Sequence, residues 1–150
     1  MHLLLVRHGD AVSSAENGDK LLSPLGHSEI LKTARMASQT IDFRLQNIYH
    51  SGKIRARQTA EILSEIIKSE NKLKQASGLG PLDSLSIWAN RLKTLDVNIA
   101  LVGHLPYMAE MTSYLTKKAH DVQFYTATIV HLTRNSDKIW KMEQVFTTHD

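Results

Sequence analysis

The sequence contains no cysteine among its 150 residues. This absence excludes disulfide bonds, thiolate catalysis and cysteine-based zinc sites, and it is compatible with a reducing compartment. Long hydrophobic runs are absent as well, because the apolar start of the chain ends at Arg7 and no segment approaches the roughly 20 apolar residues of a membrane span. No charged segment precedes a long apolar core, so no secretory leader is expected. We therefore expect a cytoplasmic protein without membrane association.

A large excess of charge of one sign is also missing. The 18 Lys and Arg residues stand against 15 Asp and Glu residues, which gives a formal net charge of +3. This balance favours acidic partners only in a general way, and it does not describe a polybasic surface. We therefore expect no nucleic-acid partner, and any catalytic nucleophile must be a residue other than cysteine.

The length suits a single domain over residues 1–150 with one core. Strands alternate with amphipathic helices, and a pair of strands closes the chain. This order predicts an α/β fold, namely a three-layer α/β/α sandwich with a mostly parallel central sheet and an antiparallel edge. The expected strands are 3–6, 45–50, 98–102, 122–133 and 139–147; the expected helices are 24–41, 54–68, a segment capped at 83–84 that runs to 95, and 106–116; and loops are expected at 11–22 and 69–83, where 73–76 could form a short strand.

Three of the expected strands end at clusters of basic residues. In chain order these clusters contain Arg7 and His8, then Arg55, then His104. Ligands of open α/β sheets collect outside the carboxyl ends of the strands, so these side chains are expected to converge on one substrate. Two arginines and two histidines at one place predict a pocket for a dianionic phosphoryl group.

The residue types in these clusters suit phosphoryl chemistry. The planar guanidinium of Arg7 or Arg55 matches phosphoryl oxygens, and a place in the first turn of a helix would add backbone N–H groups to Arg55. A neutral imidazole is a competent nucleophile, and nearby cations lower its pKa further. If a backbone acceptor holds Nδ1–H of His8, Nε2 carries the attacking lone pair. Gly9 would let the chain turn sharply and bring the substrate phosphate close.

The order of these motifs resembles the histidine phosphatase superfamily, which includes the cofactor-dependent phosphoglycerate mutases. The Arg-His-Gly motif is present as Arg7-His8-Gly9. The second motif of the family, Ser-Pro-x-x-Arg-Ala-x-Gln-Thr-Ala, corresponds to residues 51–60, and a late Gly-His motif is present at 103–104. The order and the spacing both fit the family.

Within the superfamily, residues 7–11, 22–26 and 104–106 are most similar to the SixA phosphohistidine phosphatases. The resemblance covers nearly the whole chain. It implies a phosphoglycerate mutase-like fold and a single histidine phosphatase domain over residues 1–150.

The resemblance also implies a role for each matching residue. His8 attacks phosphorus and is transiently phosphorylated, after which water hydrolyses the intermediate and releases inorganic phosphate. Arg7 and Arg55 bind the phosphoryl oxygens, and His104 completes the pocket. Neither a metal nor another cofactor is expected, because the guanidiniums and His104 supply the charge stabilisation that magnesium supplies elsewhere.

Two departures from the family pattern stand out. Gly52 replaces the usual proline but leaves Arg55 in register. Many family members carry a glutamate as proton donor after the third strand, whereas this chain has Gly78 at that place in an ungapped comparison and Asp83 as the only nearby carboxylate. An alkoxide leaving group needs a general acid far more than the imidazole of phosphohistidine does. The missing glutamate therefore favours a P–N substrate, with Asp83 as a possible acid.

These observations lead to one hypothesis and two alternatives. The chain is expected to be a metal-independent phosphatase that hydrolyses phosphohistidine on a signalling protein through phospho-His8. The short chain leaves no room for long insertions over the pocket, which favours a phosphorylated protein as the substrate. The first alternative is a small-molecule phosphomonoesterase of the same fold, with Asp83 as the acid. The second is a non-catalytic module that binds phosphoproteins.

Overall fold

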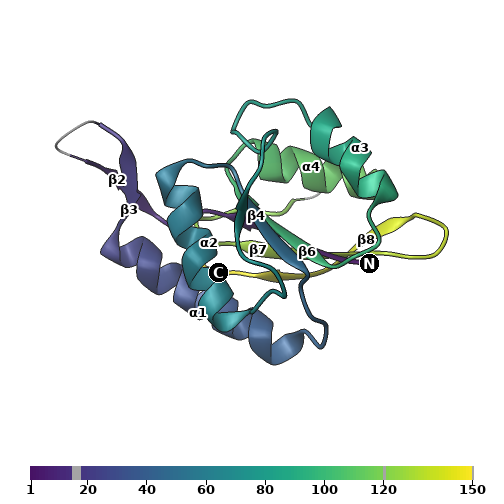
Figure 1. The fold of residues 1–150 in the computed structure, drawn as a ribbon, viewed down its shortest axis with the longest axis horizontal. Helices are drawn as coiled ribbons and strands as arrows, with labels where there is room; N and C mark the ends of the chain where they lie inside the picture. Colours follow the sequence, from purple (N-terminus) through teal and green to yellow (C-terminus); the bar gives the residue numbers. More distant parts are fainter. Residues whose placement is uncertain (15–17, 120, 150) are drawn as a thin grey trace.

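The computed structural model describes residues 1–14, 18–119 and 121–149, and a six-stranded sheet lies at its centre (Figure 1). The first four strands in the order of the sheet pair in parallel, and the last two add antiparallel pairings. The predicted mostly parallel sheet with an antiparallel edge is confirmed. In the order of the sheet, the strands are β5 (Lys74–Gln75), β4 (Asn47–His50), β6 (Ile99–Gly103), β1 (His2–Arg7), β7 (Ile129–Arg134) and β8 (Trp140–Phe146).

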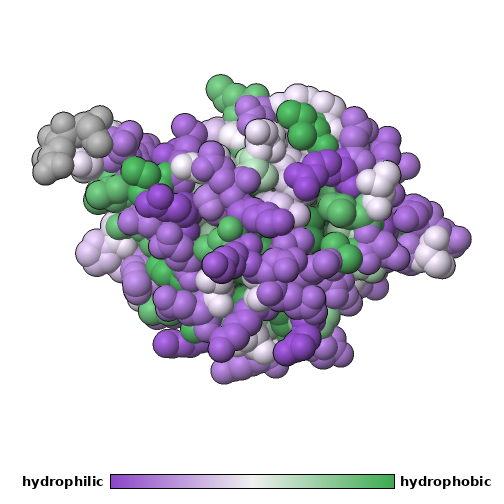
Figure 2. Space-filling model, in the orientation of Figure 1, coloured by the Kyte–Doolittle hydropathy of each residue, from purple (hydrophilic) through white to green (hydrophobic). Residues whose placement is uncertain are grey.

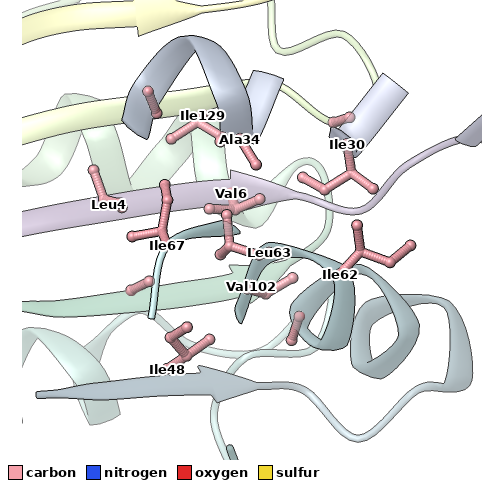
Figure 3. Close-up of a cluster of buried hydrophobic side chains, with 14 of the residues drawn as sticks. Leu4, Val6, Ile30, Ala34, Ile48, Ile62, Leu63, Ile67, Val102 and Ile129 are labelled. Carbon is pink, nitrogen blue, oxygen red and sulfur yellow. The ribbon is translucent and has the colours of Figure 1, made fainter. Parts of the chain in front are cut away.

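Helices cover both faces of the sheet and give the three predicted layers (Figure 1). The side chains of strand β1 point alternately to the two faces of the sheet. Leu4 and Val6 pack against the first two helices, as Figure 3 shows, and Leu3 and Leu5 pack against the last two. Both sets are fully buried, so β1 is a central strand. The helices are α1 (Pro24–Thr40) and α2 (Ile54–Ile66) on one face, and α3 (Ser86–Thr94) and α4 (Tyr107–Thr116) on the other.

The register of the parallel strands brings three strand ends to one level. Arg7 at the end of β1 pairs with Gly103 at the end of β6, and His50 at the end of β4 pairs with Val102. The segments that follow these three strands therefore leave the sheet side by side. This is the edge at which ligands of open α/β sheets collect.

The prediction of a loop over 11–22 is wrong for residues 11–13 and 20–22, and residues 15–17 of that range lie outside the described residues. Strands β2 (Ala11–Ser13) and β3 (Lys20–Leu22) pair in an antiparallel hairpin, which projects from one end of the sheet (Figure 1). The base of this hairpin is tied to α2, because the N–H of Leu22 donates to Oε1 of Gln58 at 2.8 Å. A contact with a distant helix thus stabilises these two strands, which are too short and too polar to be predicted from their own sequence pattern.

The expected strand over 122–133 is also too long, because β7 begins only at Ile129. Ala127 adopts a left-handed conformation (φ 61°), and its N–H donates to the carbonyl of His8 instead of continuing the ladder. In α3, the expected cap at 83–84 is displaced to Leu85. The expected cap of α1 is present, since Oγ of Ser23 accepts from the N–H of Gly26.

No helix within 1–14, 18–119 and 121–149 is long and apolar enough to cross a membrane. The face drawn in Figure 2 is mostly hydrophilic, and hydrophobic side chains lie on it in separate small groups.

Candidate active site

Arg7, His8, Arg55 and His104 line one cavity of about 280 Å³ at the carboxyl ends of β1 and β6. His8 follows β1 directly, and its N–H donates to the carbonyl of Gly103 at 2.9 Å. His104 follows β6, and Arg55 lies in the first turn of α2. The structure thus brings together the four side chains that the sequence singled out.

The imidazole of His8 is held in one tautomer by its two neighbours. Nδ1 donates to the carbonyl of Gly9 at 2.7 Å, and Nε of Arg55 donates to Nε2 of His8 at 3.3 Å. Nε2 therefore carries a lone pair. Burial lowers the pKa of His8 to about 4, helped by the charges of Arg55, Arg7 and Lys20. His8 is neutral at pH 7 and has the protonation state of a nucleophile.

His104 is a second neutral imidazole beside the first. Its ring centroid lies 5.1 Å from that of His8, and Nε2 lies 2.7 Å from Oγ of Ser51. The Ser51 hydroxyl accepts from the N–H of Lys53, so its own hydrogen can be donated to Nε2. Nδ1 is buried without a partner among the described residues. Burial lowers the pKa of His104 to about 3, with further lowering by His8 and Arg55.

Arg7 is fixed in place and keeps part of its hydrogen-bonding capacity. Nη1 donates to the carbonyl of Phe124 at 2.7 Å, while the buried Nε has no partner among the described residues. Burial lowers the pKa of Arg7, and the carboxylate of Glu29 opposes this by favouring the charged form. An oxyanion is the kind of group that satisfies unpartnered donors such as Nε of Arg7 and Nδ1 of His104.

Lys20 is a further cation at the cavity that the sequence did not single out. It lies in β3 and lines the cavity with Asp10 and Thr126. The predicted loop over 11–22 hid this placement, since only the hairpin brings Lys20 back to His8. Three cations and one carboxylate line the cavity within the described parts of the chain. This excess suits a phosphoryl dianion.

Glu29 is a second residue that sequence reasoning missed. It is only 5% exposed, although it is charged and belongs to α1. Its carboxylate accepts from the backbone N–H of Asp10 at 3.0 Å and from Oγ1 of Thr126 at 2.8 Å, and it pairs with His149 at 3.3 Å. Glu29 therefore joins two segments of the cavity wall, and no spacing in the sequence marks that role.

Gln58 and Thr59 of the 51–60 motif hold the cavity wall and do not line the cavity. Oγ1 of Thr59 donates to the carbonyl of Arg55 and accepts from the N–H of Gly9, and Gln58 holds the hairpin. Gly9 was expected to bring phosphate close, but its N–H is used by Thr59. A Cβ at this position would lie 2.7 Å from the carbonyl oxygen of Gly26, so Gly9 allows close packing of the β1 end on α1.

The structure does not bring Asp83 into the cavity. Its carboxylate accepts from the N–H of Gly80 at 2.7 Å and lines the neighbouring cavity instead. Gly78 adopts φ 84°, and a Cβ there would lie 2.9 Å from Cγ2 of Ile87. A glutamate at position 78 would therefore be strained in this backbone. Gly52 has φ 92°, which the proline of the family motif could not adopt.

A pH titration of the free protein is expected to show the neutral state of His8. Because the folded chain disfavours the charged form, lowering the pH through about 4, rather than through the ordinary 6.5, protonates Nε2 and removes the nucleophile. Below the pKa of His8, kcat/KM should fall about tenfold per pH unit. NMR titration of the His8 ring, assigned with a His8→Gln variant, checks this directly. A midpoint at the ordinary value would contradict the burial argument.

Comparisons with known proteins agree with this geometry. A sequence model of the histidine phosphatase superfamily (branch 1) matches residues 3–79. A phosphohistidine phosphatase SixA homolog from Haemophilus influenzae is 26% identical over 150 residues, covering 92% of this chain and 91% of the relative. The structure of the protein histidine phosphatase SixA complexed with tungstate superposes with a TM-score of 0.86 at 20% identity, covering 98% of this chain and 97% of that one. A mycobacterial glucosyl-3-phosphoglycerate phosphatase complexed with VO3 shares the fold at a TM-score of 0.72 and 15% identity, covering 98% and 99%.

Proposed function

Because this chain belongs to the histidine phosphatase superfamily, we propose that it is a phosphohistidine phosphatase that acts on a phosphorylated protein and releases inorganic phosphate. The observation that carries this proposal is the state of His8. Nδ1–H of its neutral imidazole donates to the carbonyl of Gly9, and Nε2 accepts from Nε of Arg55. The same cavity is lined by Arg7 and Lys20.

The proposed reaction has two steps. In the first, Nε2 of His8 forms a bond to phosphorus while the P–N bond of the substrate breaks, and the electron pair stays on the substrate imidazole, which takes a proton from solvent. In the second, water forms a P–O bond, the bond to Nε2 breaks, and phosphate leaves with His8 neutral again. Arg7, Arg55 and Lys20 stabilise the charge on the phosphoryl oxygens in both steps.

The shortage of acids at the cavity supports a P–N substrate. Asp83 lies outside the cavity, and Gly78 stands where many family members carry the glutamate that donates a proton. Asp10 is the one carboxylate that lines the cavity within the described residues, and it accepts a hydrogen bond from Oγ of Ser23 at 2.6 Å. A leaving imidazole can be protonated by water, whereas an alkoxide requires a positioned acid.

The shape of the surface supports a protein as the substrate. A cavity of about 280 Å³ holds a phosphoryl group and little else. A shallow groove of about 680 Å³ adjoins it at Pro81 and is lined by Lys53 and Leu82. The side chain of Leu82 is 88% exposed beside this groove. We propose that the groove receives the protein surface around the phosphorylated histidine.

Phosphate release from two substrates tests the proposed activity. A protein phosphorylated on histidine with potassium phosphoramidate is compared with p-nitrophenyl phosphate, both in EDTA. A strong preference for phosphohistidine is expected. Ester hydrolysis of equal or greater efficiency would favour the small-molecule phosphomonoesterase. Binding of the phosphoprotein without any turnover would favour the non-catalytic module.

Leu82→Asp is expected to separate protein substrates from small ones. A charge placed in an apolar contact should lower kcat/KM for the phosphohistidine protein about tenfold or more. The same variant should hydrolyse phosphoramidate at the wild-type rate, because Leu82 does not line the His8 cavity. The matched control is Ile139→Asp, which changes another exposed aliphatic side chain (61% exposed) in the β7–β8 turn. Equal loss in both variants, or no loss in either, would contradict the docking role of the groove.

A further inference from the structure

A second cavity lies at the opposite end of the sheet from His8. It has a volume of about 610 Å³ and lies between α3, α4 and the β7–β8 turn. Figure 1 shows this turn and the N-terminus at one end of the sheet and the β2–β3 hairpin at the other. The volume falls within the range of roughly 300–1,000 Å³ that is usual for small-ligand sites. Neither the proposed reaction nor the groove beside His8 uses this cavity.

The floor and one wall of this second cavity are apolar and held in place. Leu92 and Leu115 line it and are nearly fully buried. The guanidinium of Arg134 donates to the carbonyls of Leu92 and Leu95 and lies 5.3 Å from the ring of Trp140. The two hydrogen bonds fix the guanidinium of Arg134 in place, and Arg134 thereby supports the Trp140 wall.

The rim of the second cavity carries three lysines, namely Lys93, Lys117 and Lys138. Among the described residues, no carboxylate forms an ion pair with any of them, and Asp96 pairs with Arg134. An apolar floor under unpaired cations is complementary to a ligand that has an apolar body and an anionic group.

The backbone at two of these lysines supports the same conclusion. Lys117 ends α4 with φ 57°, and Lys138 lies in the β7–β8 turn with φ 63°. Both positions are left-handed, a conformation in which glycine or asparagine is favoured. Both positions nevertheless carry lysine, and both lysines line the same cavity. A requirement for positive charge at this rim would explain this choice of residue.

We propose that this second cavity binds a small amphipathic anion, with an aromatic body against Leu92, Leu115 and Trp140 and a single carboxylate, sulfonate or phosphate group among the lysines. This site is separate from the phosphoryl cavity. It does not depend on the proposed phosphatase activity.

A matched pair of fluorescent probes tests this proposal on the full chain. 8-Anilinonaphthalene-1-sulfonate has both the aromatic body and the anion, and N-phenyl-1-naphthylamine has the same body without the anion. We expect one equivalent of the sulfonate probe to bind saturably. The Kd of the neutral probe should be about tenfold higher or more, because this probe lacks the contact between the sulfonate and the lysines. Equal affinity of the two probes would overturn the proposal.

Variants then locate the binding. Lys93→Glu/Lys138→Glu should weaken the sulfonate probe about tenfold or more and leave the neutral probe unaffected. The control Lys32→Glu/Lys72→Glu makes the same change in net charge elsewhere and should have no such effect. Ser113→Trp, which fills the cavity without changing charge, should weaken both probes, and near-UV circular dichroism verifies that each variant is folded.

The phosphoryl cavity is a competing anion site, and Arg55→Ala tests it, because Arg55 lines that cavity and not the second one. Retained binding of the sulfonate probe in that variant is expected. Loss of probe binding in Arg55→Ala, or equal loss in the two double variants, would place the probe elsewhere and overturn the proposal.

Discussion

His8→Gln is expected to lower phosphohistidine turnover by on the order of 10⁴-fold or more, which is the scale seen when a nucleophile is removed. Glutamine keeps a polar side chain of similar length but has no nitrogen lone pair to attack phosphorus. Arg7 and Arg55 remain able to bind the phosphoryl group, so the Kd for the phosphoprotein should change little. Rapid-quench measurement of phosphate release, together with a binding titration, checks both expectations.

The control for this variant is His27→Gln, because His27 is exposed on α1 and does not line the cavity. It should retain wild-type turnover. In the wild-type protein, denaturation during turnover should trap one phosphoryl group on His8, and NMR of the trapped peptide should place it on Nε2. A phosphoryl group on Nδ1, or none on His8, would contradict the tautomer given by the hydrogen bond to Gly9.

The parts of the fold that follow from local pattern could be predicted from the sequence. The continuous apolar runs of β1 and of β6 indicate central strands, and Ser23 before Pro24 marks the start of α1. The convergence of Arg7 and His104 follows from one rule, that parallel strands end at the same edge. These inferences need no knowledge of which distant segments touch.

The parts that depend on contacts between distant segments could not be predicted. Lys20 reaches the cavity only because Gln58 holds the hairpin against α2, and Glu29 is buried because Asp10 and Thr126 fold over it. Ala127 ends a strand whose sequence alone would allow it to continue. In each case a side chain or N–H finds its partner many residues away, and no local periodicity records that pairing.

The role of an individual residue within a motif could not be predicted either. The Arg-His-Gly triplet suggests that Gly9 serves the substrate, yet the structure shows its space taken by Gly26 and its N–H taken by Thr59. A motif therefore identifies which residues belong to a site more reliably than it identifies what each one does. Asp83, chosen for its nearness in sequence, shows the converse, since its carboxylate serves Gly80 outside the cavity.

Arg55→Ala should have the next largest effect, a fall in kcat of about 10³ to 10⁵, the range found when an arginine that stabilises a phosphoryl transition state is lost. Arg55 acts on substrate and nucleophile together, because Nε donates to Nε2 of His8 and the rest of the guanidinium is available to phosphoryl oxygens. Arg55→Lys should be intermediate, since lysine keeps the charge but lacks the planar fork.

A second readout separates these two actions of Arg55. Its charge lowers the pKa of His8, so in Arg55→Ala the NMR titration of His8 should move back toward the ordinary histidine value. Arg57→Ala is the matched control two positions along α2, where the guanidinium is half exposed and forms only a surface pair with Glu61 at 3.4 Å. It should leave kcat and the His8 titration unchanged. Equal losses in the two variants would mean that α2 tolerates no change there, and an unmoved titration in Arg55→Ala would mean that Arg55 does not control the state of the nucleophile.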